Sequence, residues 1–196
     1  MKYVLLLLAL ISAPFASADF SASATIGSDY IFRGVSQNQG PAVSGHVGFE
    51  TESGFHASAW ASQVDFDSEA EFEYDLTVGK TFTAGDITLD VSYIDYNYHD
   101  EEALDLEEVS VTFGYKAVSL AYFAGLEDAT DYMEVGVDLG FAGVSVGTVE
   151  DFGWHWQASK TIDVEGVDVT FGYRSFYGDD GISDEESAVL MLTKSF

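Results

Sequence analysis

The sequence contains no cysteine, only 2 prolines, and only 7 lysines and arginines against 34 aspartates and glutamates. Without cysteine the chain forms no disulfide, no zinc–thiolate site and no thiol nucleophile. The formal net charge of -27 would repel a phosphate backbone across most of the surface, so we expect no nucleic-acid partner. Hydrophobic residues nevertheless make up 47% of the chain and aromatic residues 15%, which argues against an acidic disordered protein. The fold must therefore separate two incompatible kinds of side chain.

The N-terminal residues predict a cleaved secretory signal peptide. Lys2 precedes an apolar run at residues 4–11, and the small residues Ala16 and Ala18 form a cleavage pattern before Asp19. An uncleaved membrane anchor is the alternative, although the run is shorter than the ~20 residues that a spanning helix needs. We therefore expect residues 1–18 to be removed and residues 19–196 to form a single exported domain in a Gram-negative cell.

Hydrophobic and polar residues in the rest of the chain alternate with a period of two. Residues 70–78, 87–93, 133–141 and 167–174 carry the clearest alternation. In an extended strand, successive residues point to opposite faces, so each segment presents one apolar and one polar wall. About twelve such segments can be distinguished, with ten or fourteen as alternatives; they begin near Phe20, Ala42, Phe55, Glu69, Ile87, Leu106, Val118, Asp131, Val144, Trp154, Val167 and Ser187.

The connections between these segments differ according to their position in the order. Short turns follow the even segments, whereas mostly longer loops follow the odd ones and hold about half of the acidic residues. This arrangement is typical of a membrane β-barrel that has its turns in the periplasm and its loops outside the cell. We predict an all-β fold: a closed antiparallel up-and-down transmembrane β-barrel of about twelve strands, with short periplasmic turns and longer acidic extracellular loops.

In such a barrel the apolar wall faces lipid and the polar wall faces the lumen. Closure of the barrel satisfies every backbone hydrogen-bonding group, as hydrocarbon requires. Aromatic side chains would then form two bands at the membrane interfaces, and Tyr30 and Phe32 would belong to the outer band. Four lysines would lie near the inner end, where their ammonium groups reach phospholipid headgroups: Lys80, Lys116, Lys160 and Lys194.

One stretch of the chain resembles a known family. Ser28-Asp29-Tyr30-Ile31-Phe32-Arg33-Gly34-Val35-Ser36-Gln37 is similar to the end of the first strand in the TorF-like family of outer-membrane porins. Further likeness at Ala59-Trp60-Ala61-Ser62, Glu73-Tyr74-Asp75-Leu76 and Asp90-Val91-Ser92-Tyr93-Ile94-Asp95-Tyr96 places the resemblance within residues 24–98. The resemblance implies a porin-like outer-membrane barrel.

The location predicts several partners. Outer-membrane lipid and lipopolysaccharide would surround the barrel, and Phe196 matches the terminal aromatic residue that such barrels often present to their insertion machinery. Lys194 stands where a second aromatic residue is common. We expect this difference to affect how efficiently the barrel is inserted into the membrane, and not its fold. The oligomeric state stays open.

The polar wall suggests the function. The residues expected to line the lumen or set its selectivity are Arg33, Glu71, Glu73, Asp75, Asp90, Glu108, Glu134, Asp138 and Arg174. Because acidic rings favour cations, we predict a porin-like channel for small solutes that prefers cations, with Arg33 and Arg174 paired to carboxylates such as Asp29 or Asp75. We expect no cofactor and no metal site.

Three alternatives remain open. A sealed or narrow barrel could act as a structural or adhesive surface protein through its acidic loops. An outer-membrane lipid hydrolase would need a serine beside a histidine, as in Ser44-x-His46 or His56-x-Ser58, a spacing that arises often by chance. A soluble ligand-binding barrel in the periplasm is the third.

Overall fold

The computed structural model describes residues 18–196 except residues 39, 67, 68 and 128. The predicted signal peptide lies outside the described residues apart from Ala18. The long strands are β1 (Ala18–Gly27), β4 (Ala42–Thr51), β5 (Phe55–Gln63), β6 (Phe72–Ala84), β7 (Ile87–Tyr98), β8 (Leu106–Tyr115), β9 (Val118–Gly125), β10 (Tyr132–Asp138), β11 (Gly143–Val149), β12 (Gly153–Val164), β13 (Val167–Gly178) and β14 (Glu185–Ser195). The remaining elements are the short strands β2 (Ile31–Phe32) and β3 (Val35–Ser36) and the 3₁₀ helix η1 (Glu102–Leu104).

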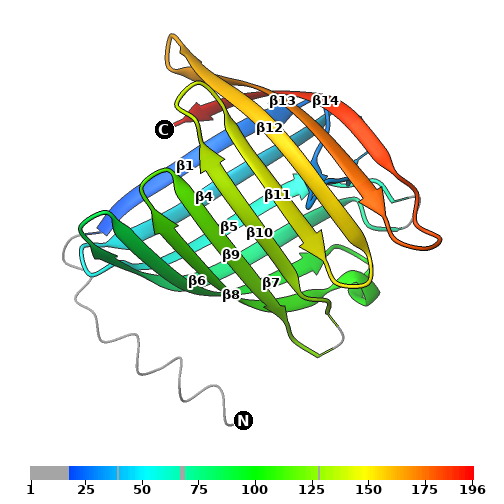
Figure 1. Cartoon of the computed structure of the whole chain (residues 1–196), viewed down its shortest axis with the longest axis horizontal. Helices are drawn as coiled ribbons and strands as arrows, with labels where there is room; N and C mark the ends of the chain where they lie inside the picture. The colour runs from blue at the N-terminus through cyan, green and yellow to red at the C-terminus, as the bar shows by residue number, and fades with distance from the viewer. Residues whose placement is uncertain (1–17, 39, 67–68, 128) are drawn as a thin grey trace.

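The long strands close into one antiparallel barrel (Figure 1). Each pairs with the next along the chain, and β1 closes the cylinder by pairing with both β4 and β14. Thr25 of β1 stands opposite Ser44 on one side and opposite Thr193 on the other, and the Thr25 and Thr193 hydroxyls are 2.8 Å apart. The predicted closed antiparallel barrel of twelve strands is confirmed. In the described part of the chain no helix is long and apolar enough to cross a membrane.

The two ends of the barrel differ in their connections. One end, here called the turn end, has connections of two to four residues and also holds the start of β1 and the end of β14 (Figure 1). At the opposite loop end, all connections except the one between β11 and β12 have six residues or more. Glu165 and Gly166 at the turn end have φ angles of 55° and 80°, the geometry of a two-residue hairpin turn. The predicted alternation of short turns and longer loops is therefore confirmed.

The outer wall of the barrel is apolar. Leu76 is 47% exposed and Val135 is 48% exposed on this outer surface, while their chain neighbours Asp75 and Glu134 point into the lumen. Water would disfavour so large a continuous apolar surface, whereas hydrocarbon would not. The residue pattern thus places apolar side chains outside and polar ones inside, as a bilayer-spanning barrel requires.

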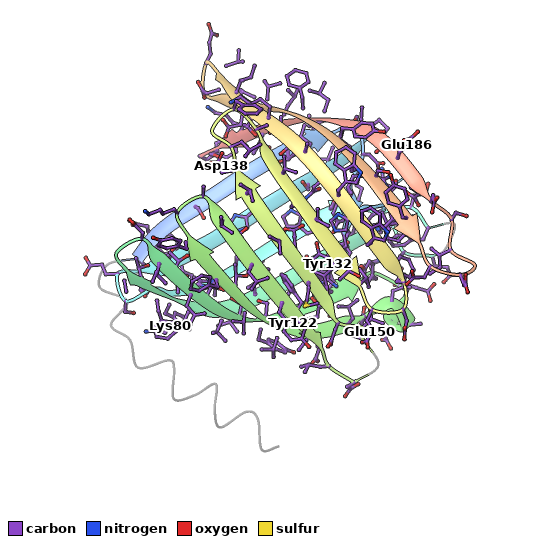
Figure 2. The ribbon with its side chains drawn as sticks, viewed as in Figure 1. Lys80, Tyr122, Tyr132, Asp138, Glu150 and Glu186 are labelled. Atoms are coloured by element: carbon purple, nitrogen blue, oxygen red, sulfur yellow. The ribbon has the colours of Figure 1, made fainter. Side chains whose placement is uncertain are left out.

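Charge is distributed unevenly along the barrel axis. Lys80 lies toward the turn end, whereas Glu150 and Glu186 lie at the loop end (Figure 2). The Lys80 Nζ atom is 5.4 Å from the ring centroid of Phe82, and Lys116 Nζ is 5.2 Å from that of Tyr115. These cation–π contacts hold lysine heads at the level where interfacial aromatic residues are found.

The hydrophobic core lies inside the barrel, near the loop end. Its buried members are Val64, Ala70, Tyr96 and Tyr98, and Tyr30 and Phe32 are among the residues packed against it. The prediction that Tyr30 and Phe32 belong to an outer aromatic band is wrong. They leave the wall because β1 ends at Gly27 and the chain then turns into the lumen.

Candidate functional site in the barrel lumen

Residues 28–41, here called the inward segment, connect β1 to β4 and fold into the lumen. The segment contacts inward-facing side chains from distant parts of the wall: the rings of Tyr30 and Trp60 are 5.0 Å apart, and those of Phe32 and Tyr96 are 5.7 Å apart. Its first residue is held to β14 by a hydrogen bond of 2.8 Å from the Ser28 backbone N–H to the Leu190 carbonyl. The segment therefore occupies the bore and does not form an external loop.

A tight hairpin forms the tip of the inward segment. Phe32 of β2 pairs with Val35 of β3, so Arg33 and Gly34 are the two turn residues. Their φ angles are 48° and 85°, and a turn with two positive φ angles favours glycine at its second position. Gly34 also lies against the wall, because a Cβ atom at this position would stand 2.4 Å from the Cβ of His155. Only glycine satisfies both requirements.

Arg33 is held by a bidentate ion pair with Glu108 and by contacts with aromatic rings. Its Nη1 and Nη2 atoms donate hydrogen bonds of 2.7 Å and 2.6 Å to the two carboxylate oxygens of Glu108 on β8. The Tyr132 ring centroid lies 4.3 Å from the guanidinium carbon, and Phe32 and Phe123 also face it. Glu108 is 0% exposed, so this pair is desolvated and its geometry is well satisfied.

Arg174 on β13 fixes the other side of the same hairpin. Its Nη2 atom donates to Glu185 at 2.9 Å, its Nε atom donates to the Ser187 hydroxyl at 3.0 Å, and its Nη1 atom donates to the Gly34 carbonyl. We predicted Asp29 or Asp75 as partners of the two arginines, and this prediction is wrong. The pairing of β13 with β14 places Glu185 beside Arg174, and the fold of the inward segment carries Arg33 to Glu108.

The carboxylates that remain in the lumen have varied surroundings. Asp90 accepts hydrogen bonds from Thr81 at 2.7 Å and Ser92 at 2.6 Å, and it lies 2.8 Å from His56 Nε2. Glu134 accepts from the Tyr132 hydroxyl at 2.9 Å and from Ser145 at 3.1 Å. Neither carboxylate has an arginine or lysine partner among the described residues.

Glu73 and Asp75 on β6 are the exception to this pattern of satisfied groups. Glu73 is 0% exposed, and both of its carboxylate oxygens and the Oδ1 atom of Asp75 have no hydrogen-bond partner. The Tyr30 and Tyr98 hydroxyls approach Glu73 without reaching hydrogen-bond geometry. Burial, with the charge of Glu73 as a smaller cause, raises the pKa of Tyr30, so its hydroxyl stays protonated.

Two of the predicted lumen residues do not join the others. Glu71 precedes the first residue of β6 and is exposed at the loop end. Asp138 is the last residue of β10 and lies at the turn end (Figure 2), where it accepts a hydrogen bond of 2.7 Å from the Gly140 N–H and lines a cavity at that mouth of the bore. The other seven predicted residues lie deeper in the lumen.

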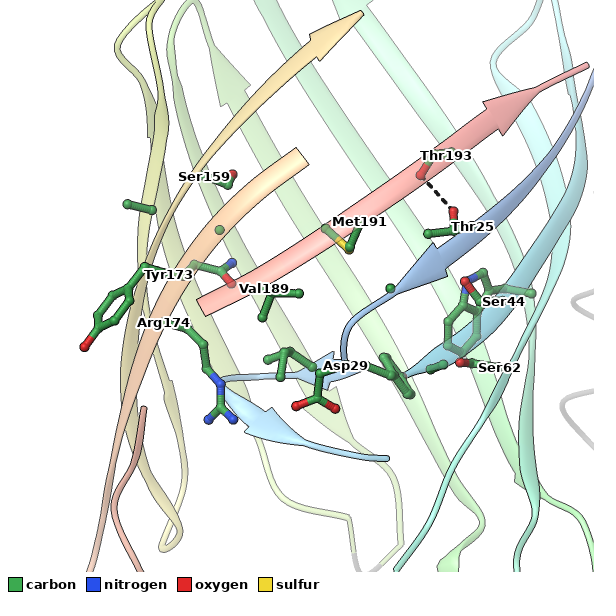
Figure 3. Close-up of a pocket in the computed structure, with 18 residues that line it drawn as sticks. Thr25, Asp29, Ser44, Ser62, Ser159, Tyr173, Arg174, Val189, Met191 and Thr193 are labelled. Carbon is green, nitrogen blue, oxygen red and sulfur yellow. Dashed lines mark hydrogen bonds between the residues drawn. The ribbon is translucent and has the colours of Figure 1, made fainter. Parts of the chain in front are cut away.

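The inward segment separates cavities on its two sides. A cavity of about 430 Å³ in the middle of the bore is lined by Asp29 and Tyr30 of the segment and by inward-facing residues of six strands (Figure 3). It shares Gln157 and Ser159 with a cavity of about 400 Å³ toward the turn end. A cavity of about 380 Å³ on the loop side is lined by Phe32, Arg33, Val35 and Gln37 of the segment. The segment is thus the constriction of the bore.

Two histidines that point into the lumen are each engaged through Nε2 by an oxygen atom of another side chain. His56 Nε2 is engaged by Asp90 at 2.8 Å, and His155 Nε2 is engaged by the Tyr132 hydroxyl at 2.9 Å. Within the described residues, no group of three or more His, Asp or Glu side chains is arranged to hold a metal ion.

Comparison with known proteins places this barrel in a family. A family model with the description "Bacterial protein of unknown function (Gcw_chp)" matches residues 12–183. The chain belongs to the Gcw_chp family. No curated protein matches the sequence. Because the family description carries no function, the resemblance to TorF-like porins stays a prediction.

Solved structures share the fold of this Gcw_chp protein. The "KdgM porin" has a TM-score of 0.63 at 6% sequence identity, over 90% of this chain and 99% of that chain. The "KdgM porin in complex with disordered oligogalacturonate" has a TM-score of 0.60 at 5% identity, over 92% of this chain and 99% of that chain. At these identities the likeness shows a common porin-like barrel.

Several residues of the Gcw_chp constriction were not predicted from the sequence. They include Glu185, His155, Tyr132 and Trp60, all of which point inward against the inward segment. The signal available in the sequence was the presence of large aromatic side chains at strand positions that face the lumen. Such side chains are unfavourable against water, so they indicate that a part of the chain packs inside the barrel.

Proposed function

We propose that this Gcw_chp protein is an outer-membrane channel for passive diffusion of small solutes, that it prefers cations, and that the inward segment is its constriction. The observation that carries the proposal is the state of the two arginines in the sequence. Each is bound to a carboxylate, while Asp90 and Glu134 have no arginine or lysine partner among the described residues. The fixed charge left over in the bore is therefore negative, which favours cations.

The outer membrane is the location that the barrel surface supports. The apolar band would face hydrocarbon, the lysines near the turn end would face phospholipid headgroups, and the acidic loops would face lipopolysaccharide. Phe196 is 81% exposed at the turn end, and its N–H donates a hydrogen bond of 3.0 Å to the Ala22 carbonyl. We propose that this exposed ring is available to the barrel-insertion machinery.

The bore does not favour the ligand of the solved KdgM complex. Oligogalacturonate is a polyanion, and a channel that takes it should present unpaired cationic groups to the carboxylates of the sugar. Here Arg33 lies against Glu108, and Arg174 lies against Glu185. We therefore propose neutral or cationic solutes for this channel.

Single-channel recording in a planar lipid bilayer tests the proposal. The protein is inserted between solutions of different potassium chloride concentration, and the reversal potential reports which ion crosses more readily. We expect a conducting state with cation preference. Anion preference would contradict the selectivity, and zero conductance from folded protein would contradict the channel.

A sealed barrel that acts through its acidic loops is the second candidate. The packing of Tyr30 and Phe32 against the aromatic core near the loop end favours it, because this cluster fills the bore there. Deletion of the hairpin tip, residues 31–36, distinguishes the two. A constricted channel should conduct before the deletion and conduct more after it, whereas a sealed barrel should conduct only after it.

A further inference from the structure

Two carboxylates lie side by side on β6 without a fixed counter-charge. Glu73 is 0% exposed, and its Oε1 and Oε2 atoms are buried together with Oδ1 of Asp75, all without a hydrogen-bond partner. Leaving a buried carboxylate without a partner is strongly unfavourable. This pair therefore requires a positive species that the chain itself does not provide.

Among the described residues, no lysine, arginine or histidine forms an ion pair with Glu73 or Asp75. The sequence has two arginines: Arg33 is bound through both carboxylate oxygens of Glu108, and Arg174 is bound to Glu185. Lys80, on the same strand as the pair, has the outward parity and contacts Phe82 near the turn end. The pair must accordingly be neutralised by a species from solution, either protons or a metal ion.

Oxygen atoms surround the pair on three sides. Tyr98 of β7 is the cross-strand neighbour of Glu73, and Tyr30 approaches from the inward segment. Their hydroxyls and the Asp75 carboxyl gather around Glu73 without forming standard hydrogen bonds to it. The groups next to the Glu73 carboxylate are thus the Asp75 carboxyl and two phenol hydroxyls, and all of them offer oxygen atoms as ligands.

An ion can reach this place from the bore. On β5, Ser62 stands opposite Glu73 and Trp60 stands opposite Asp75. Both Ser62 and Trp60 line the cavity of about 430 Å³, and Asp75 is partly exposed. The pair is therefore one residue away from the solvent-accessible part of the lumen.

We propose that Glu73 and Asp75 bind one divalent cation of the calcium type, with the hydroxyl oxygens of Tyr30 and Tyr98 as further ligands. A divalent ion balances two carboxylates, and an all-oxygen donor set of irregular geometry is what calcium prefers. Because Tyr30 belongs to the inward segment and the other ligands belong to the wall, the bound ion fastens the segment to β6 and β7. The cation therefore sets how firmly the constriction is held.

Terbium luminescence tests this site, because terbium replaces calcium and is excited through nearby tryptophan and tyrosine rings. The folded protein in detergent is titrated with terbium and then with calcium as competitor. We expect a saturable signal of one terbium per barrel, which calcium displaces, from the site beside Trp60. The paired variant Glu73→Gln with Asp75→Asn should lose this signal, while Glu71→Gln, which changes an exposed carboxylate beside the same strand, should keep it.

The acidic loops are the main source of a false signal, and the variants separate it from the site. A signal that persists in the paired variant would come from the loops and would overturn the proposal. Absence of a saturable signal in the wild-type protein would also overturn it and would indicate that protons balance the pair. These readouts measure binding, so their outcome is independent of whether the barrel conducts.

A second variant covers the case in which the paired variant does not fold. Tyr30→Phe keeps both carboxylates and the ring but removes one ligand oxygen, so affinity for calcium should fall on the order of tenfold. The thermal unfolding midpoint of the wild-type protein should rise with calcium concentration, and that of Tyr30→Phe should need more calcium for the same rise. Identical calcium dependence in the two proteins would contradict the role of Tyr30.

Discussion

Arg33 and Glu108 are 75 residues apart in the sequence and form a two-pronged ion pair inside the barrel. The pair joins the tip of the inward segment to β8 near its loop end, so it links the part of the chain that narrows the bore to the wall that forms it. Tyr96 adds a hydrogen bond of 3.0 Å to the same carboxylate. The constriction is thus held by a buried ion pair. Aromatic rings contact its arginine, and a tyrosine hydroxyl donates to its glutamate.

The first prediction concerns the removal of this ion pair. Arg33→Ala leaves Glu108 buried without a counter-charge, which should lower the free energy of unfolding by about 3–5 kcal/mol. The loosened segment should also raise single-channel conductance. Urea unfolding in lipid vesicles and bilayer recording measure the two effects.

Two comparisons support the interpretation of Arg33→Ala. Lys116→Ala breaks an exposed pair with Asp86, 3.9 Å long, and should leave stability nearly unchanged. Arg33→Met combined with Glu108→Met replaces the pair with apolar side chains and should be more stable than Arg33→Ala. If Arg33→Ala were as stable and as conductive as the wild-type protein, the pair would not hold the constriction.

The second prediction concerns Gly34 at the hairpin tip. Gly34→Ala should destabilise the barrel through two effects: backbone strain at positive φ, worth roughly 1–3 kcal/mol, and overlap with His155, worth a further ~1–3 kcal/mol. Gly140→Ala is the matched control, because its φ of 81° is similar to the 85° of Gly34 and nothing lies within 4 Å of its added Cβ. Thermal unfolding of both variants should show the larger loss for Gly34→Ala; equal losses would mean that the hairpin tip moves freely away from His155.

The barrel could be predicted from the sequence because its pattern is local and repeated. A strand of period two places every second residue on the lipid side, so Leu76 and Val135 could be assigned outward without knowledge of their neighbours. Turn length follows from residues adjacent in the chain. Closure required only that the last strand meet the first, which β14 and β1 do.

The constriction could not be predicted in the same way, because it depends on contacts between distant residues. The alternation extends from β1 toward Tyr30 and Phe32, and this continuity favoured a longer strand. Whether the chain stays in the wall or turns inward at Gly27 depends on aromatic partners such as Trp60 and Tyr96 from other strands. The carboxylate partner of Arg174 depends on strand register, which the pattern alone leaves undetermined, and that of Arg33 depends on the path of the inward segment.

The third prediction concerns ion selectivity. Glu134→Gln removes one negative charge from the lumen and keeps an oxygen that can accept hydrogen bonds from Tyr132 and Ser145. A unit charge about 8 Å from a passing ion in water contributes roughly 0.5 kcal/mol, with opposite sign for a cation and an anion, so the cation-to-anion permeability ratio should fall about fivefold. Glu186→Gln, on the outward side at the loop end, should leave the ratio unchanged. Reversal potentials measure both; an unchanged ratio in Glu134→Gln would place Glu134 outside the ion path.

The fourth prediction tests which side of the wall faces lipid, using two neighbouring residues of β6. Val78 has the outward parity and stands opposite Tyr93 of β7, whereas Thr77 has the inward parity. Val78→Lys places an ammonium group on the outer wall and should lower the free energy of unfolding from vesicles by about 2–4 kcal/mol, because hydrocarbon does not solvate the charge. Thr77→Lys places the same group in a polar, acidic lumen and should be far better tolerated. Equal losses for the two variants, or a larger loss for Thr77→Lys, would mean that the apolar wall does not face the bilayer, and the channel proposal would fail with it.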